Sequence, residues 1–317
     1  MRWVDIQRIE SDSDIKIKLM SRKIVCFGEM LWDVFPEHKI VGGAPLNVAL
    51  RLHTLGNKVQ MISRIGEDPM GEDLVNYLVD NGLSTEFIQR DAIHSTGEVK
   101  VNLNEKGSAS YEILSPRAWD AIDVSVKDLE LVSESDVFIF GSLAARNKST
   151  RGSLEMLLKQ ASYKVFDVNL RSPFYSTELL ASLMQHADFI KFNDEELFEI
   201  ATELGCTSIS LEQNIMFIAH RFGCSQLCVT KGKHGAVLFY KGEMHYSSGF
   251  HVTVVDTVGA GDSFLATLIT YLPSHSPKEA LDYACAMGAL VASRKGANPD
   301  ISIAMLESMV GKDKQFQ

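Results

Sequence analysis

The residues with the clearest chemical potential lie late in the chain, in the segment DTVGAGDSF at residues 256–264. Gly259, Ala260 and Gly261 form a turn of small residues that leads directly into an amphipathic helix. Glycine lets a ligand approach the backbone closely, and a helix N-terminus presents unpaired N–H groups and the positive end of its dipole. We therefore predict an anion hole for a transferring phosphoryl group. Asp262 is placed to take the proton of an attacking hydroxyl.

A simpler interpretation is that Asp262 is the N-cap of this helix and that the glycines only shape a turn. An N-cap needs one Asp, Asn or Ser, and it explains neither Gly-Ala-Gly nor the second acid, Asp256, six residues upstream. No GxxxxGK[ST] motif occurs in the chain, so we expect the GAGD loop itself to hold the phosphates. We favour the catalytic interpretation.

Composition limits the possible partners. The chain has 317 residues, 45% of them hydrophobic, and a net charge of −10, which disfavours nucleic acids and anionic membranes as partners. No apolar run reaches membrane-spanning length, and five cysteines without a CxxC pair indicate reduced thiols in a cytoplasmic protein. Residues 1–19 are polar and lack the apolar stretch of a signal peptide. We expect a polar extension at 1–19 and a single domain at 20–317.

Short apolar runs alternate with helical patterns from residue 23 onward, which predicts a mainly parallel sheet covered by helices on both faces. The predicted strands are Lys23–Phe27, Lys58–Ser63, Asp136–Phe140, Lys164–Val168, Phe189–Phe192, Leu227–Thr230 and Ala236–Tyr240, with a further apolar strand ending at Asp256. Residues 97–114 have no helical period and divide around 104–107, as a β-hairpin does. We expect residues 33–41 and 93–115 to form a small β lid.

The segment DTVGAGDSF resembles the C-terminal signature of the ribokinase (PfkB) family of carbohydrate kinases. GGAPLNVALRLHTLG at 42–56 and RIGEDPMG at 64–71 resemble its N-terminal signature, and the similarity runs from about Lys23 to Ile301. The resemblance implies a ribokinase-like, doubly wound α/β fold with a β lid. It also implies ATP and Mg²⁺ as cofactors and the Asp of GAGD as the base.

The resemblance also implies the residues of the acceptor side. Asp33 would hold sugar hydroxyls, and Gly42 and Gly43 would let the sugar lie against bare backbone. The amide of Asn47 would reach the same sugar. In the DVNLR segment at 167–171, Asn169 and Arg171 would position the acceptor or its phosphate. The alternatives are a solvated loop acid for Asp33, a helix-start residue for Asn47 and an exposed arginine for Arg171.

On the nucleotide side, Asn193 and Glu196 match the NxxE motif, which in the family organises the water network of Mg²⁺ and phosphate. The same pair also fits a helix capping box. Through this water network, Glu196 would contact Mg²⁺ only indirectly.

Thr230, Gly232 and Gly235 match the nucleotide-side turn TxGxxG of the family. Taken alone, this pattern resembles any tight turn.

The segment SRKGAN at 293–298 resembles the loop that closes over the adenine. Members of the family often bind a monovalent cation, here expected to be K⁺, through main-chain carbonyls of this loop and of the strand end at Asp256. The corresponding residues here are Asp256, Val258, Val291, Arg294 and Gly296.

Several segments, among them GEMLWD, IGEDPMG and DVNLR, are similar to the fructokinase branch of the family. Phosphorylation of fructose at its 6-hydroxyl is therefore the first expectation. Ribose, 2-keto-3-deoxygluconate and a nucleoside stay open as acceptors, and so does a non-catalytic sugar-binding regulator. A homodimer formed through the lid is expected by analogy.

Overall fold

The computed structural model describes residues 21–103 and 109–313. The predicted extension at 1–19 and the predicted hairpin tip at 104–107 lie outside these residues. Within the described part, no helix is both long and apolar enough to cross a membrane.

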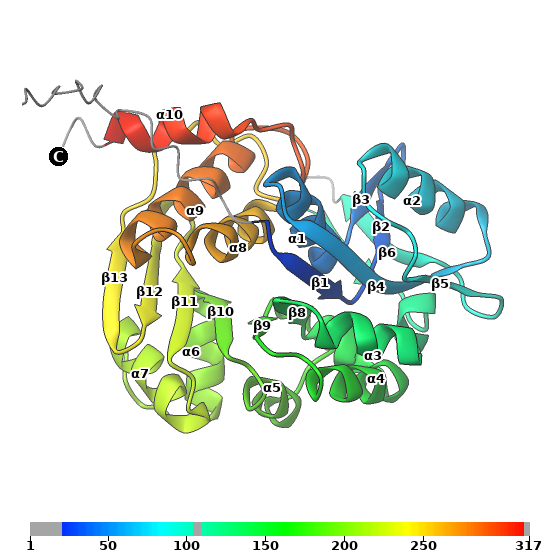
Figure 1. Ribbon diagram of the computed structural model, residues 1–317, viewed down its shortest axis with the longest axis horizontal. Helices are drawn as coiled ribbons and strands as arrows, with labels where there is room; N and C mark the ends of the chain where they lie inside the picture. Colours follow the sequence, from blue (N-terminus) through cyan, green and yellow to red (C-terminus); the bar gives the residue numbers. More distant parts are fainter. Residues whose placement is uncertain (1–20, 104–108, 314–317) are drawn as a thin grey trace, which may run out of the picture.

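A nine-stranded sheet forms the centre of the molecule (Figure 1). In spatial order its strands are β13 (Glu243–Ser247), β12 (Ala236–Tyr240), β11 (Gln226–Thr230), β10 (Phe189–Asn193), β9 (Lys164–Asp167), β8 (Val137–Gly141), β1 (Lys23–Phe27), β4 (Lys58–Gly66) and β5 (Ile88–Asp91). Neighbouring strands pair parallel except β11 with β12 and β12 with β13, which pair antiparallel. The chain runs outward from β1 to β4 and β5, and later from β8 toward β13. The strand order therefore reverses between β1 and β8, where open α/β sheets bind their ligands.

Helices cover both faces of this sheet (Figure 1). Successive residues of β1 show why, since Ile24 and Cys26 belong to one buried cluster and Val25 and Phe27 to the other. The first cluster includes residues of α1 (Ala44–Thr54), α2 (Pro69–Asp80), α8 (Ala260–Tyr271), α9 (Pro277–Ala292) and α10 (Ile303–Asp313). The second includes residues of α3 (Val126–Ser133), α4 (Lys148–Leu158), α5 (Thr177–Met184), α6 (Asp194–Glu203) and α7 (Leu211–Phe222). The doubly wound architecture is confirmed.

A second, four-stranded sheet forms the predicted lid. It contains β3 (Lys39–Gly42), β2 (Leu31–Val34), β6 (Gly97–Leu103) and β7 (Ala109–Ile113), in that spatial order. Strand β2 begins four residues after β1 ends, so the chain passes directly from the main sheet into the lid. The lid strands extend slightly beyond 33–41 and stay within 93–115.

The prediction of a strand that ends at Asp256 is wrong. Residues 251–256 form no strand, and Val254 and Val255 are more than half exposed. The N–H groups of Val255 and Asp256 both bond to the carbonyl of Ala292 at the end of α9, so this segment pairs with a helix end and joins no sheet. The apolar run resembles a strand, but its valines do not enter the core.

Candidate active site

Asp262 is the third residue of α8, and Gly259 is the N-cap of that helix with φ 74°. The N-cap interpretation of Asp262 is therefore wrong. Its carboxylate instead accepts a hydrogen bond of 2.8 Å from Nδ2 of Asn47 on α1. Burial raises the pKa of Asp262 to about 6, and the nearby Asp167 carboxylate adds to this shift, while Lys191 opposes it. The group is thus a carboxylate at neutral pH that lies close to its protonation range, as suits a general base.

The two glycines of the loop have different environments. A Cβ at Gly259 would collide with the carbonyl of Ala297, so only glycine fits there in its left-handed conformation. At Gly261, the nearest atom to a built Cβ is Nζ of Lys191, 3.5 Å away. A buried cation therefore lies directly behind the first turn of α8, where the dipole is also positive.

The acceptor-side residues predicted from the sequence converge on one place. Gly42 of β3 lies against Asp33 of β2, since a Cβ at Gly42 would be 2.5 Å from Oδ2 of Asp33. A Cβ at Gly43, which has φ 108°, would be 2.5 Å from the carbonyl of Glu29. These contacts fix the turn that starts α1, and α1 in turn carries Asn47 to Asp262.

Three carboxyl groups at this site interact with one arginine. Burial raises the pKa of Asp33 to about 6 and that of Glu29 to about 7, and in both cases Arg171 partly offsets the rise. Arg171 also lowers the pKa of Asp262. Arg171 is exposed, and its only hydrogen bond among the described residues is from Nη1 to its neighbouring carbonyl, Leu170 O. Its guanidinium therefore has donors left for a ligand.

Sequence reasoning missed Glu29 and Asp167 as site residues. Both line a small cavity of about 10 Å³, together with Asn169, at the carboxyl ends of β1, β8 and β9. Each has one buried oxygen without a partner in the described part of the chain, Oε2 of Glu29 and Oδ2 of Asp167. Asn169 has φ 40°, a conformation that few residues other than glycine adopt. The signal available in the sequence was position, because Glu29 is the second residue after β1, at the switch point.

Lys191 of β10 was also missed. Its Nζ lies 2.8 Å from Oδ1 of Asp167, and both side chains are buried. Burial alone would lower the pKa of Lys191, but the carboxylates of Asp167 and Glu196 outweigh it, and the net shift is upward. Lys191 is therefore a fixed positive charge beneath the GAGD loop.

The NxxE pair forms the capping box that the sequence suggested. Asn193 Oδ1 accepts from the N–H of Glu196, and Oε2 of Glu196 accepts from the N–H of Asn193, each at 2.8 Å. Oε1 of Glu196 accepts from the N–H of Leu170 at 2.9 Å. With both oxygens bonded to backbone, Glu196 fits a water-mediated role better than direct metal ligation. Among the described residues, no group of three or more acidic, His or Cys side chains could hold a metal.

The TxGxxG turn lies beside this capping box. Thr230 ends β11 directly opposite Asn193 of β10. Gly232 and Gly235 have φ 53° and 78°, and a Cβ at Gly235 would collide with the backbone of Ser247. Strand pairing therefore aligns the two nucleotide-side motifs.

In the predicted cation loop, the side chain of Asp256 bridges two segments. Oδ1 accepts from the N–H of Val258 and Oδ2 from the N–H of Gly296, both at 3.0 Å. The carbonyl of Val291 already accepts from the N–H of Arg294 at 2.9 Å. The five residues are brought together, but the carbonyl of Val291 is committed to the end of its helix.

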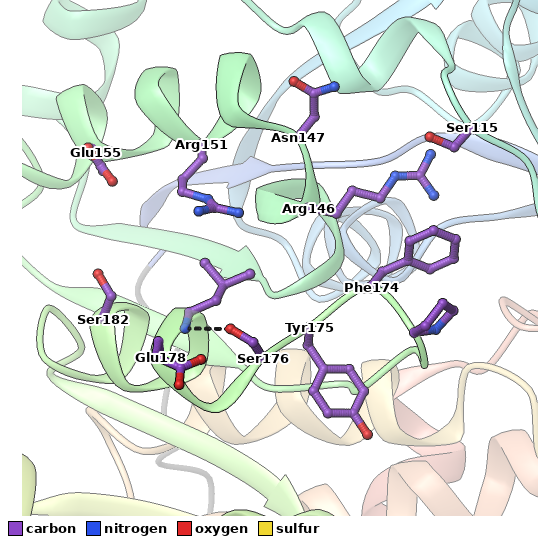
Figure 2. Close-up of a pocket in the computed structure, with 12 residues that line it drawn as sticks. Ser115, Arg146, Asn147, Arg151, Glu155, Phe174, Tyr175, Ser176, Glu178 and Ser182 are labelled. Atoms are coloured by element: carbon purple, nitrogen blue, oxygen red, sulfur yellow. Dashed lines mark hydrogen bonds between the residues drawn. The ribbon is translucent and has the colours of Figure 1, made fainter.

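A larger hollow of about 490 Å³ lies between α4 and α5, and Figure 2 shows its lining. None of the predicted site residues lines it. Its Arg146 is committed elsewhere, since the guanidinium stacks 3.8 Å from the ring centre of Trp119 and bonds twice to Asp120 at 2.7 Å. This contact gives Trp119 and Asp120 a structural role. The chemistry therefore belongs to the cluster around Asp262.

Comparison with known proteins agrees with this geometry. Residues 13–304 match the family described as pfkB family carbohydrate kinase. The chain is 29% identical to a fructokinase of Escherichia coli, covering 88% of this chain and 95% of the relative. It is 31% identical to fructokinase-2 of Solanum lycopersicum, covering 89% and 93%. A crystal structure of Vibrio cholerae fructokinase in fructose, ADP and calcium ion bound form is 25% identical, with a TM-score of 0.78 over 92% of this chain and 100% of that one.

Proposed function

The chain belongs to the pfkB family of carbohydrate kinases, and from this we propose that it transfers the γ-phosphoryl group of ATP to the 6-hydroxyl of fructose. The observation that carries the proposal is the contact between Asn47 and Asp262, which joins the predicted sugar side to the predicted base. One hydroxyl placed against this pair would have a proton acceptor and an orienting amide at the same point.

The proposed reaction assigns a role to each part of the site. Asp262 accepts the proton of the sugar hydroxyl as its oxygen attacks the γ-phosphorus. The N–H groups at the start of α8 and the buried charge of Lys191 stabilise the negative charge on the transferring group. Mg²⁺ would be held by the phosphates and by water that Glu196 and Asn193 orient, and it would neutralise phosphate charge when bound.

The charges around the acceptor side favour a neutral sugar. Glu29, Asp33 and Asp262 surround the site, and Arg171 is the exposed cation that interacts with all three. A sugar that already carries a phosphate would be repelled by the carboxylates of Asp33 and Asp262, which are mainly ionised at neutral pH. Carboxylates are also good acceptors for neighbouring hydroxyls. The named relatives support fructose among neutral sugars.

A phosphorylation screen tests the proposal. Purified protein is incubated with ATP and Mg²⁺ and with fructose, ribose, 2-keto-3-deoxygluconate, a nucleoside or fructose 6-phosphate. We expect kcat/KM for fructose to exceed that of every other acceptor at least tenfold. A higher value for another acceptor would contradict fructose while keeping the kinase. An absence of turnover with any acceptor would favour the regulator.

A further inference from the structure

A chain of hydrogen bonds connects the loop after α9 to Asp262. Nδ2 of Asn298 donates to Oδ1 of Asn47 at 2.9 Å, and Nδ2 of Asn47 donates to Oδ2 of Asp262 at 2.8 Å. Asn47 is 4% exposed, so its amide is almost fully shielded from solvent. The two asparagines are 251 residues apart in the sequence, so no local motif predicts their contact.

The sense of each bond in this chain is fixed by chemistry. An ionised carboxylate can only accept, so Asn47 must present its NH₂ group to Asp262. The carbonyl oxygen of Asn47 then faces Asn298, which must present its NH₂ group as the donor. Oδ1 of Asn298 is left buried and without a partner among the described residues. Asn298 thus takes part in this chain only through its amide donor.

The loop that carries Asn298 is held against the anion hole at several other points. Ala297 packs against Gly259 so closely that no side chain would fit at Gly259. Arg51 of α1 is buried and donates to the carbonyl of Pro299 at 2.9 Å and to Oγ of Ser263 at 3.1 Å. The loop, α1 and the start of α8 therefore form one braced unit.

We propose that Asn298 is a positioning residue that fixes the amide orientation of Asn47 and thereby holds Asp262 as a competent base. The inference rests on the proposed role of Asp262. It connects the loop expected to close over the nucleotide with the group expected to deprotonate the sugar. A shift of this loop would therefore be transmitted to the base through one amide.

Two substitutions separate this role from simple packing. Asn298→Ala removes the donor, so Asn47 can rotate and its bond to Asp262 weakens. Asn298→Asp keeps the shape of the side chain but replaces the donor with an acceptor. This change favours a flipped Asn47 amide, whose oxygen would then face the carboxylate of Asp262. The isosteric variant should therefore be the more damaging of the two.

The pH profile of kcat is the decisive measurement. The charged groups that act on Asp262 are Asp167, Lys191, Arg171 and Glu29. Asn298→Ala adds no charge, so its shift reports the lost bond alone, whereas Asn298→Asp also adds a carboxylate that raises the pKa of Asp262 directly. The bond from Asn47 lowers the pKa of Asp262, so losing it must move the acid limb of the profile to higher pH. We expect a shift of about half a pH unit for Asn298→Ala and about one unit for Asn298→Asp, with kcat at pH 7.5 reduced about 3- to 10-fold and more than 10-fold.

Asn57→Ala is the matched control. Asn57 also ties α1 to α8, through bonds from Nδ2 to Leu52 O at 3.1 Å and to Thr270 Oγ1 at 3.0 Å, but at the opposite ends of these helices. It should lower Tm without moving the acid limb. A ¹³C-carboxyl NMR titration, with the Asp262 signal identified by its loss in Asp262→Asn, reports the same pKa without turnover.

The NMR titration keeps this inference separate from the proposed function. A shifted Asp262 titration in a protein that phosphorylates no tested acceptor would support the relay and contradict the reaction. An unshifted titration in both Asn298 variants would overturn the relay. So would a rise in KM for ATP alone, because Asn298 would then act only as a nucleotide contact.

Discussion

The ammonium group of Lys191 and the carboxylate of Asp167 form a buried ion pair of 2.8 Å directly behind the first turn of α8. The pair is not symmetric, because Oδ2 of Asp167 has no partner in the described structure while Lys191 also interacts with Glu196 and Asp262. One cation therefore compensates several acids. Removing it would leave those acids buried without a counter-charge.

Lys191→Met should destabilise the fold by about 3–5 kcal/mol, because breaking a buried pair leaves an uncompensated charge. The double variant Lys191→Met/Asp167→Leu should regain part of that loss. Both the single and the double variant should have low activity, because each lacks the positive charge beneath the anion hole. We expect kcat of each variant to fall at least about tenfold. Denaturant unfolding and steady-state kinetics on the same samples check this. Normal kcat in the double variant would assign Lys191 to stability alone.

Asp262→Asn should lower kcat by about 10² or more, because an amide cannot accept the proton. Folding raises the pKa of Asp262, so its ionisation above about pH 6 opposes folding, and this penalty vanishes below the ordinary pKa of an aspartate. The variant should therefore have a Tm equal to the parent or up to about 4 °C higher. Asp128→Asn is the control, since Asp128 is also the third residue of a helix. It should lower Tm and keep kcat.

The activity should decline as pH falls through about 6. Burial raises the pKa values of Asp262 and Asp33 to about 6, and only the ionised base can take a proton. Replacing Arg171 by Leu removes a charge that lowers both pKa values, so the acid limb should move to higher pH. Profiles of kcat/KM between pH 5 and 9 measure this. A limb near pH 4 would show that the base is a more exposed acid.

Asp33→Ala should cost about 2–4 kcal/mol in kcat/KM for fructose, the scale of lost hydrogen bonds to a charged group. ATP binding should be nearly unchanged, because Asp33 lies on the lid strand β2 and the nucleotide motifs end β10 and β11. Fructose kinetics and nucleotide titration on this variant are the two measurements. If both decline together, Asp33 has a structural role, and if neither changes, the sugar binds elsewhere.

Replacing Na⁺ by K⁺ at constant ionic strength should increase kcat if backbone atoms of the loops around Asp256 and Gly296 hold a monovalent ion. The side chain of Asp256 already bridges these loops, so Asp256→Ala should abolish the difference between the two salts. Equal rates of the parent in K⁺, Na⁺ and tetramethylammonium would remove the cation from the proposal.

Local patterns in the sequence were sufficient for most of the architecture. Helices were identified by the period of their apolar residues. Strands such as β1 were identified as short continuous apolar runs, because both faces of β1 are buried. This criterion failed at 251–256, where an apolar run remains exposed because the end of α9 occupies its hydrogen bonds. The short strands β5 and β13 were missed because edge strands bury too little to show a pattern.

For the candidate site, motifs located the residues but not the contacts among them. Lys191 looks like any polar residue within a strand, and only the register of β9 and β10 places it against Asp167. Asn298 belongs to the loop at 293–298, for which the family resemblance implies contacts of the main chain only. The resemblance therefore gave no role to the side chain of Asn298. Long-range pairs of this kind depend on the tertiary fold, which no local spacing encodes.

The chain passes from β1 directly into lid strand β2, so most of the predicted acceptor-side residues lie close together in the sequence. Glu29, Asp33, Gly42, Gly43 and Asn47 come from one short early stretch, whereas Lys191, Glu196, the GAGD loop and Asn298 come from the second half. Under the proposed roles, substitutions in the early stretch, together with those at Asn169 and Arg171, would change which hydroxyl compound is accepted, while the rest of the later stretch would keep the transfer chemistry. Asn47 contacts residues of the later stretch as well, through Asp262 and Asn298. A lineage that adopts a new acceptor should keep this asparagine while its neighbours diverge.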